Sequence, residues 1–210
     1  MILTDLQRDA LAEMANISAS GIASQLSLLL RDTITIRVPT ARMVSLRWLR
    51  EQIEPNSGGS DTGCVYQALS GSFDGRIYLL LHDERSRSLL HALVGDVTTG
   101  TEYADLQAYE HEAMTEIGNI IISSFAAMMI ELLNSELELS LPAYLEGSTR
   151  QLLFMSGAEP IDEDQPSVIV IDTELHATER QVSGSLLLIL RLLPVTALLQ
   201  RLDAMMAELS

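Results

Sequence analysis

The chain has 210 residues, of which 47 % are hydrophobic and only 4 % aromatic, so it can bury a sizeable and mostly aliphatic core. Thirteen basic residues against 29 acidic ones give a formal net charge of −16. That charge disfavours nucleic acid and anionic membranes as partners, because both require a basic surface, and it is compatible with a basic protein partner.

The compartment is indicated by one cysteine and by the absence of long apolar runs. Cys64 cannot form an internal disulfide, so a reducing cytoplasm is the natural interpretation, and we expect this thiol to be buried and structural. Asp5 and Arg8 interrupt the N-terminus before any signal-like segment develops. The apolar run 186–193 is far shorter than the about 20 residues that span a bilayer. We therefore predict a cytoplasmic protein without membrane insertion.

Two long helical patterns divide the chain, at residues 5–31 and 104–134, and similar elements follow each of them. Alternation of apolar and polar residues predicts a strand after each helix, because one face of such a strand is buried. The first half is expected to contain a strand at 33–39, a loop at 54–63, strands at 64–72 and 75–82, and a helix at 83–94. The second half is expected to contain a strand at 136–142, a loop at 157–166, strands at 167–175 and 181–191, and a helix at 194–208.

The two halves match at an offset of 103 residues. Asn16 and Asn119 are each followed by 22 residues and then by a proline, Pro39 or Pro142, which ends the predicted strand. We interpret the chain as a single domain, 1–210, made of two repeats at about 1–103 and 104–210. The expected fold class is α/β (α+β): an internally duplicated domain with an about six-stranded, mostly antiparallel sheet, two long motif-bearing helices and pseudo-twofold symmetry.

Both long helices carry the same polar motif. It consists of an acidic residue, a glutamate four positions later and an asparagine three positions after that: Asp9, Glu13 and Asn16, then Glu112, Glu116 and Asn119. At 100° per residue these side chains, with Ser20 or Ser123, fall within a stripe of about 60°. The apolar side chains of the first helix fall opposite: Leu11, Ala15, Ile22, Leu26 and Leu29. The stripe should therefore face solvent while the apolar side faces the core.

Apolar residues flank the stripe, namely Ile17 in the first helix and Ala113 and Ile120 in the second. A polar pair next to exposed aliphatic side chains favours a docking surface over a fully solvated face. A single Glu and Asn three residues apart would mean little, since such pairs are common on exposed helices. The repetition is more informative, because asparagine is a poor helix former and the residues around it have diverged between the copies.

The pattern Asp-x3-Glu-x2-Asn-x22-Pro, present twice in a chain of this length, resembles the CheC family of chemotaxis phosphatases, whose relatives include CheX and FliY. The resemblance covers nearly the whole chain. Its length and two motifs favour CheC itself, because FliY-like proteins carry a further domain and CheX-like proteins usually keep one motif. One departure is Glu112, where the family pattern prefers Asp or Ser, and a second is the pair Ser18 and Ser20, where the family usually has a glycine-rich texture.

The resemblance implies that the substrate is the phosphorylated receiver CheY and that the reaction is hydrolysis of its phosphoaspartate. Asn16 and Asn119 would then orient the attacking water, while Glu13 and Glu116 would pair with the receiver's active-site lysine. The supporting or docking residues would be Asp9, Glu112, Ser20 and Ser123. No cofactor is expected in this chain, since the receiver supplies Mg²⁺. The deamidase CheD is a second implied partner.

Two other functions are compatible with the same residues. The chain could be an adaptor that binds CheY-P or CheD without hydrolysis, or the helix surface could mediate dimerisation. Metal binding is also not expected. The four histidines (His82, His91, His111 and His176) have no second ligand at a spacing typical of metal sites.

Overall fold

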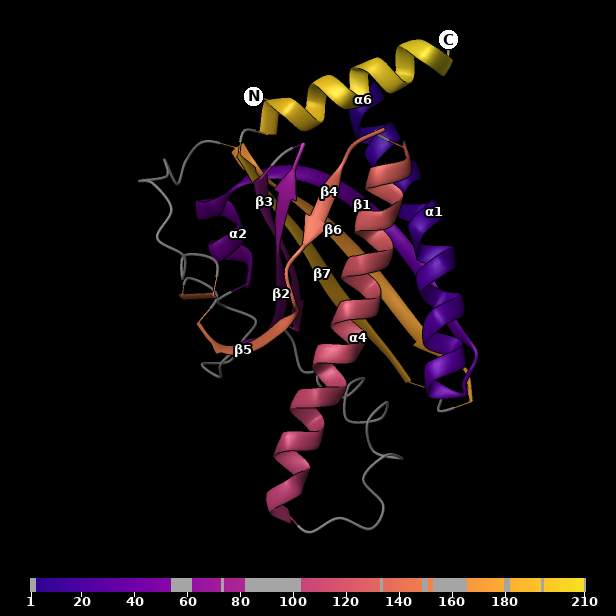
Figure 1. Cartoon of the computed structure of the whole chain (residues 1–210), viewed down its shortest axis with the longest axis vertical. Coiled ribbons are helices and arrows are strands. Elements are labelled where there is room, and N and C mark those ends of the chain that lie inside the picture. Colours follow the sequence, from indigo (N-terminus) through magenta and orange to yellow (C-terminus); the bar gives the residue numbers. More distant parts are fainter. Residues whose placement is uncertain are drawn as a thin grey trace.

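The computed structural model of the chain describes residues 3–53, 62–72, 74–81, 103–132, 134–148, 151–152, 166–179, 182–193 and 195–209. Its helices are α1 (Asp5–Leu30), α2 (Leu46–Ile53), α4 (Tyr103–Leu132) and α6 (Val195–Leu209). Its strands are β1 (Ile34–Ser45), β2 (Thr62–Gly71), β3 (Asp74–Leu81), β4 (Leu137–Leu139), β5 (Ala143–Gly147), β6 (Pro166–Ala177) and β7 (Val182–Leu193). In Figure 1, α1 and α4 stand side by side against the sheet, and α6 lies across one end of it.

All seven strands form one antiparallel sheet with the order β1-β6-β7-β3-β2-β4, in which β5 also pairs with β2. The mixed helix–sheet fold class is therefore confirmed. If β1, β2 and β3 are exchanged for β4/β5, β6 and β7, the order reads the same in reverse. The symmetry of the strand order is what an internal duplication requires; the duplication itself stays a prediction.

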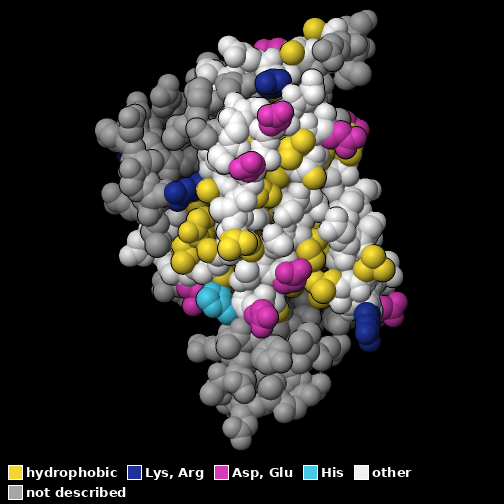
Figure 2. Space-filling view, viewed as in Figure 1, with side chains coloured by type: hydrophobic (Ala, Val, Ile, Leu, Met, Phe, Trp, Pro, Cys, Tyr) yellow, Lys and Arg dark blue, Asp and Glu magenta, His cyan; other side chains and the backbone are white. Residues whose placement is uncertain are grey.

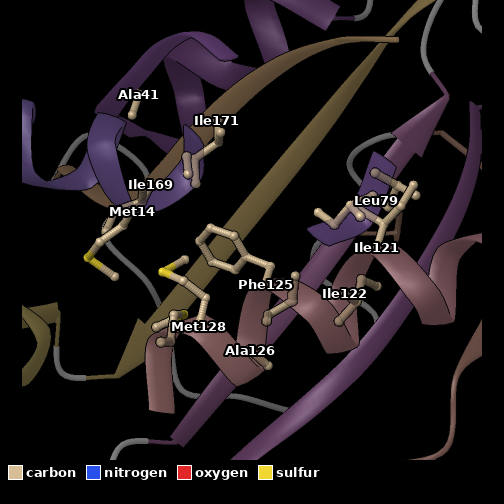
Figure 3. Close-up of a cluster of buried hydrophobic side chains, with 14 of the residues drawn as sticks. Met14, Ala41, Leu79, Ile121, Ile122, Phe125, Ala126, Met128, Ile169 and Ile171 are labelled. Carbon is tan, nitrogen blue, oxygen red and sulfur yellow. The ribbon is translucent and has the colours of Figure 1, made fainter. Parts of the chain in front are cut away.

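The two faces of the sheet carry separate cores, as alternation along each strand dictates. Along β2 and β3, Val65 and Leu79 point to the side of α1 and α4, whereas Cys64 and Leu80 point to the side of α2. The core on the side of α1 and α4 is the larger of the two. Figure 3 shows Phe125 of α4 within this core, beside Met128.

Helices α1 and α4 run antiparallel to each other (Figure 1), and the Gln25 side-chain amide donates to Ser124 Oγ across them at 3.1 Å. Helix α1 begins with a capping box, in which Thr4 and Gln7 satisfy each other's backbone N–H groups. The Gln7 side chain also donates to Asp203 of α6 at 2.8 Å. Both long helices are thus fixed on the same face of the sheet.

The prediction that the strand after each long helix ends at its proline is wrong in the first half. Strand β1 continues through Pro39 to Ser45, with a register shift against β6 between Arg37 and Thr40. Strand β1 lies at the edge of the sheet, where a proline N is not required for a ladder hydrogen bond, and an irregularity accommodates it.

In the second half the strand predicted at 136–142 is confirmed only as β4, and the next strand, β5, was not predicted; the described residues thus form seven strands in place of six. The interruption at residues 140–142 includes Pro142, which has no N–H to donate. Side chains repair the pairing with β2: Gln67 Nε2 donates to the Ser140 carbonyl at 2.8 Å, and the Ala68 N–H donates to Ser140 Oγ at 2.9 Å.

The other predicted strands and the last helix are confirmed within a few residues by β2, β3, β6, β7 and α6. The helix predicted at 83–94, and most of the loops predicted at 54–63 and 157–166, lie outside the described residues. Helix α2 was not predicted.

Candidate functional site

The motif on α1 lies open to solvent. The side chains of Asp9, Glu13, Asn16 and Ser20 are all exposed, as the helical periodicity predicted. Within the described part of the chain, no hydrogen bond or ion pair engages the Glu13 carboxylate or the Asn16 carboxamide. Both groups are therefore available to a partner.

The motif on α4 is held more closely by the protein. Glu112 and Glu116 are exposed, whereas Asn119 and Ser123 are half-buried. The Ser123 hydroxyl donates to Asn119 Oδ1 at 3.1 Å. A carboxamide oxygen has two lone pairs, so Asn119 keeps one of them and both of its N–H donors.

A glycine next to Asn119 explains why α4 lies so near the sheet. A Cβ built on Gly118 would meet the side-chain carbons of Val65 at 2.5 Å, so only glycine permits this approach of helix and strand. The equivalent position in α1 is Ala15, which is buried with its methyl group in place. Helix α4 therefore packs closer to β2 than a side chain at position 118 would allow.

The two motifs form separate sites. Gln25 and Ser124 mark the same level of the antiparallel helix pair, with Asn16 nine residues from Gln25 and Asn119 five residues from Ser124 on the opposite side. At about 1.5 Å per residue, the asparagines are roughly 21 Å apart along the helices. One phosphoryl group cannot contact both, so each motif would act alone.

The expected apolar flank is present, but it differs between the sites. Ile17 is 49 % exposed, whereas Ala113 and Ile120 are half-buried. Leu29 was predicted to face the core and is 47 % exposed, because it lies in the last turn, where Leu30 takes the buried place and the chain leaves the helix at Arg31.

Sequence reasoning missed Leu28, which is 82 % exposed. It lies one turn beyond Gln25, so the antiparallel register puts it level with the turn of α4 that follows Asn119. Its position about 60° from Glu13 on the helix could have revealed it. In Figure 2, acidic and hydrophobic side chains are interspersed over this face, and Lys and Arg are few.

A carboxylate and a carboxamide can bind a cation and orient a water, and orienting a water requires no covalent nucleophile. Among the described residues, no group of three side chains could hold a metal ion. His82 and His91 lie outside these residues. The His111 ring stacks edge-on against Tyr144, with ring centroids 4.7 Å apart, and its Nε2 lies 3.2 Å from the Tyr144 carbonyl oxygen.

Cys64 is fully buried, as predicted, and burial raises the pKa of its thiol because the thiolate would be desolvated. The segment His111–Glu131 of α4 is long and apolar enough by composition to cross a membrane, but half of it is buried within the protein. Its apolar residues include Ile117, Ile121 and Phe125, which belong to the core on the helix side of the sheet.

Comparison with known proteins bears on these two motifs. A model of the CheC-like family matches residues 6–42, which include the whole α1 motif. The CheY-P phosphatase CheC of Bacillus subtilis is 23 % identical over 177 residues, which cover 83 % of this chain and 82 % of that protein. The resemblance to the CheC family is confirmed. The putative CheY-P phosphatase CheC1 of Halobacterium salinarum is 22 % identical, and the match covers 88 % of this chain and 90 % of that protein.

Solved structures show the same fold. The crystal structure of Thermotoga maritima FliY is 20 % identical, has a TM-score of 0.73 and covers 98 % of this CheC-like chain and 100 % of its own. The FliM middle domain from H. pylori is 11 % identical and has a TM-score of 0.60. The match covers 96 % of this chain and 99 % of the FliM chain. Proteins with different names, FliY and FliM, therefore share this fold, and the fold alone does not identify an activity.

Proposed function

We propose that this CheC-like chain is a cytoplasmic chemotaxis phosphatase that hydrolyses the phosphoaspartate of a CheY-like receiver. The observation that carries the proposal is that each long helix presents a glutamate and an asparagine one turn apart on its outward face. The names of the curated relatives, which are CheY-P phosphatases, support the same substrate.

In the proposed reaction, a water oxygen forms a bond to phosphorus while the bond from phosphorus to the aspartyl oxygen breaks. The products are a free aspartate carboxylate and inorganic phosphate, and the proton of the water leaves to solvent or phosphate. The receiver would bring its own Mg²⁺ and lysine, so this chain needs no cofactor. Asn16 or Asn119 would hold the water in line, in the way that a glutamine orients water in GTPases. The gain comes from orientation, since a carboxamide is not a base.

Glu13 and Glu116 would bind the receiver's active-site lysine and so fix the docking register. The exposure of both carboxylates supports this role. Asp9 and Glu112, one turn earlier, would add negative charge that attracts the same basic group.

The lysine contact can be tested without activity. The chain contains no lysine, so a carbodiimide, which joins carboxylates to amines, can link it to a receiver only through a receiver amine, apart from the N-terminal amine of this chain. We expect a crosslink whose yield falls when Glu13→Gln and Glu116→Gln are combined. A crosslink of unchanged yield in that double variant would exclude the docking role of these carboxylates.

A non-catalytic adaptor that binds CheY-P or CheD is the second candidate, because a polar motif beside the exposed Ile17 can also dock a partner without hydrolysis. The two functions differ in turnover. With cognate CheY-P and Mg²⁺, we expect the wild-type chain to accelerate loss of label and Asn16→Ala/Asn119→Ala to abolish the acceleration while still binding the receiver. A wild-type chain that binds CheY-P but leaves its spontaneous decay unchanged would support the adaptor instead.

A further inference from the structure

We propose that Ser123 is a positioning residue that fixes the Asn119 carboxamide in one orientation and so makes the α4 site the faster of the two. This inference rests on the proposed function, which it deepens. The hydroxyl of Ser123 acts through Asn119 and does not itself contact the substrate.

The hydrogen bond of Ser123 differs from those of the other hydroxyl groups on the two helices. A serine or threonine inside a helix commonly donates to a backbone carbonyl one turn earlier. Four hydroxyl groups on α1 and α4 do so: Ser18 to Ala15, Ser24 to Ser20, Ser27 to Ala23 and Thr115 to His111. Ser123 instead donates to the Oδ1 of a side chain, Asn119.

Such a bond matters because the two ends of a carboxamide are nearly equal in size and opposite in function. The oxygen accepts hydrogen bonds and the nitrogen donates them, and rotation of the terminal torsion exchanges the two. With Ser123 on Oδ1, the oxygen is directed along the helix and the N–H groups point away from the hydroxyl. An in-line water then meets the same donors and the same remaining lone pair in every encounter.

The site on α1 lacks this restraint. Ser20 stands where Ser123 stands in α4, but it is exposed and makes no hydrogen bond to Asn16. Asn16 is exposed as well, so solvent competes for both ends of its carboxamide, whereas half-burial of Asn119 limits that competition. An unrestrained carboxamide must be ordered during the reaction, which lowers the rate.

The kinetic test isolates the α4 site in an Asn16→Ala background. Ser123→Ala should lower kcat about two- to ten-fold, the value of one net hydrogen bond, and leave KM unchanged. Ser123→Thr keeps a hydroxyl and should restore kcat. Thr115→Ala, which removes a hydroxyl from the same helix, is the control and should not change kcat. A kcat that Ser123→Ala leaves at the background value would overturn the proposal.

A measurement on the free protein separates this inference from the proposed function. NMR relaxation of the side-chain NH₂ groups should show Asn119 more ordered than Asn16, and Ser123→Ala should remove the difference. Equal order in the wild-type chain would overturn the inference even where hydrolysis is observed. Absence of hydrolysis with Asn119 ordered through Ser123 would instead refute the proposed function and, with it, the rate difference, but not the positioning of Asn119 by Ser123.

Discussion

Helices α1 and α4 carry the same motif in different surroundings. On α1, Glu13 and Asn16 are both exposed, and Ala15 keeps a methyl group between the helix and the core. On α4, Gly118 lets the backbone approach Val65, and Asn119 is half-buried with its oxygen bonded to Ser123. The two sites thus carry the same functional groups, but the carboxamide of the α4 site is restrained by its surroundings and that of the α1 site is not.

The largest change in the free energy of unfolding should come from a substitution in the core under α4. Phe125→Ala removes a fully buried ring, and we expect it to lower the free energy of unfolding by about 3–5 kcal/mol. The equivalent position in α1 is Ile22, which is also buried, and Ile22→Ala should cost about 2–4 kcal/mol because less volume is lost. Urea unfolding with unchanged m-values would measure both. Leu28→Ala, at an exposed site, is the control and should change stability by less than about 0.5 kcal/mol; equal losses in all three would contradict the assignment of the core.

A pair of glycine substitutions tests the close packing of α4. Gly118→Ala forces a methyl group into Val65 and should destabilise the protein by about 1–3 kcal/mol. Gly21→Ala in α1 meets nothing within 4 Å, so the gain in helix propensity should stabilise it by about 0.5–1 kcal/mol. Thermal unfolding should therefore give shifts of opposite sign. Two stabilising shifts would mean that α4 does not need to approach β2 so closely.

The exposed flank of the α1 site should contribute to receiver docking. In an Asn119→Ala background, Ile17→Ser should raise KM about three- to ten-fold with kcat nearly unchanged, because apolar area buried on docking is lost. Leu29→Ser removes a similarly exposed side chain that lies about 160° from Glu13 around the helix, and it serves as the control. The same KM in both variants would remove Ile17 from the docking surface.

The smallest expected change is in the rate at which Cys64 is alkylated. Cys64 lies on β2, which contacts α4, but its side chain points to the α2 side of the sheet. Its burial and raised pKa should prevent alkylation of the native protein at neutral pH, and denaturant should restore it. In Gly118→Ala, labelling should be faster because β2 opens more often. Rapid labelling of the native wild-type chain would contradict the buried position.

Periodicity predicted the two long helices and the strands with long alternating or apolar runs, since those patterns depend only on which face is buried. It did not predict that β1 passes Pro39, because the edge position that permits this is a property of the assembled sheet. Helix α2 was missed because it has only eight residues, although Ser45 Oγ accepts the N–H of Trp48 as a cap would. The motif residues and their exposure on α1 followed from the helix geometry. The half-burial of Asn119 did not, because it depends on the contact between Gly118 and a strand about 50 residues away.

The independence of the two sites is tested most directly by one assay: loss of phosphoryl label from Mg²⁺-loaded CheY-P with the wild type, Asn16→Ala and Asn119→Ala. Each single variant should retain activity, the two residual rates should sum to the wild-type rate, and Asn119→Ala should lose the larger share. Complete loss of activity in either single variant would contradict independent sites and point to one composite site.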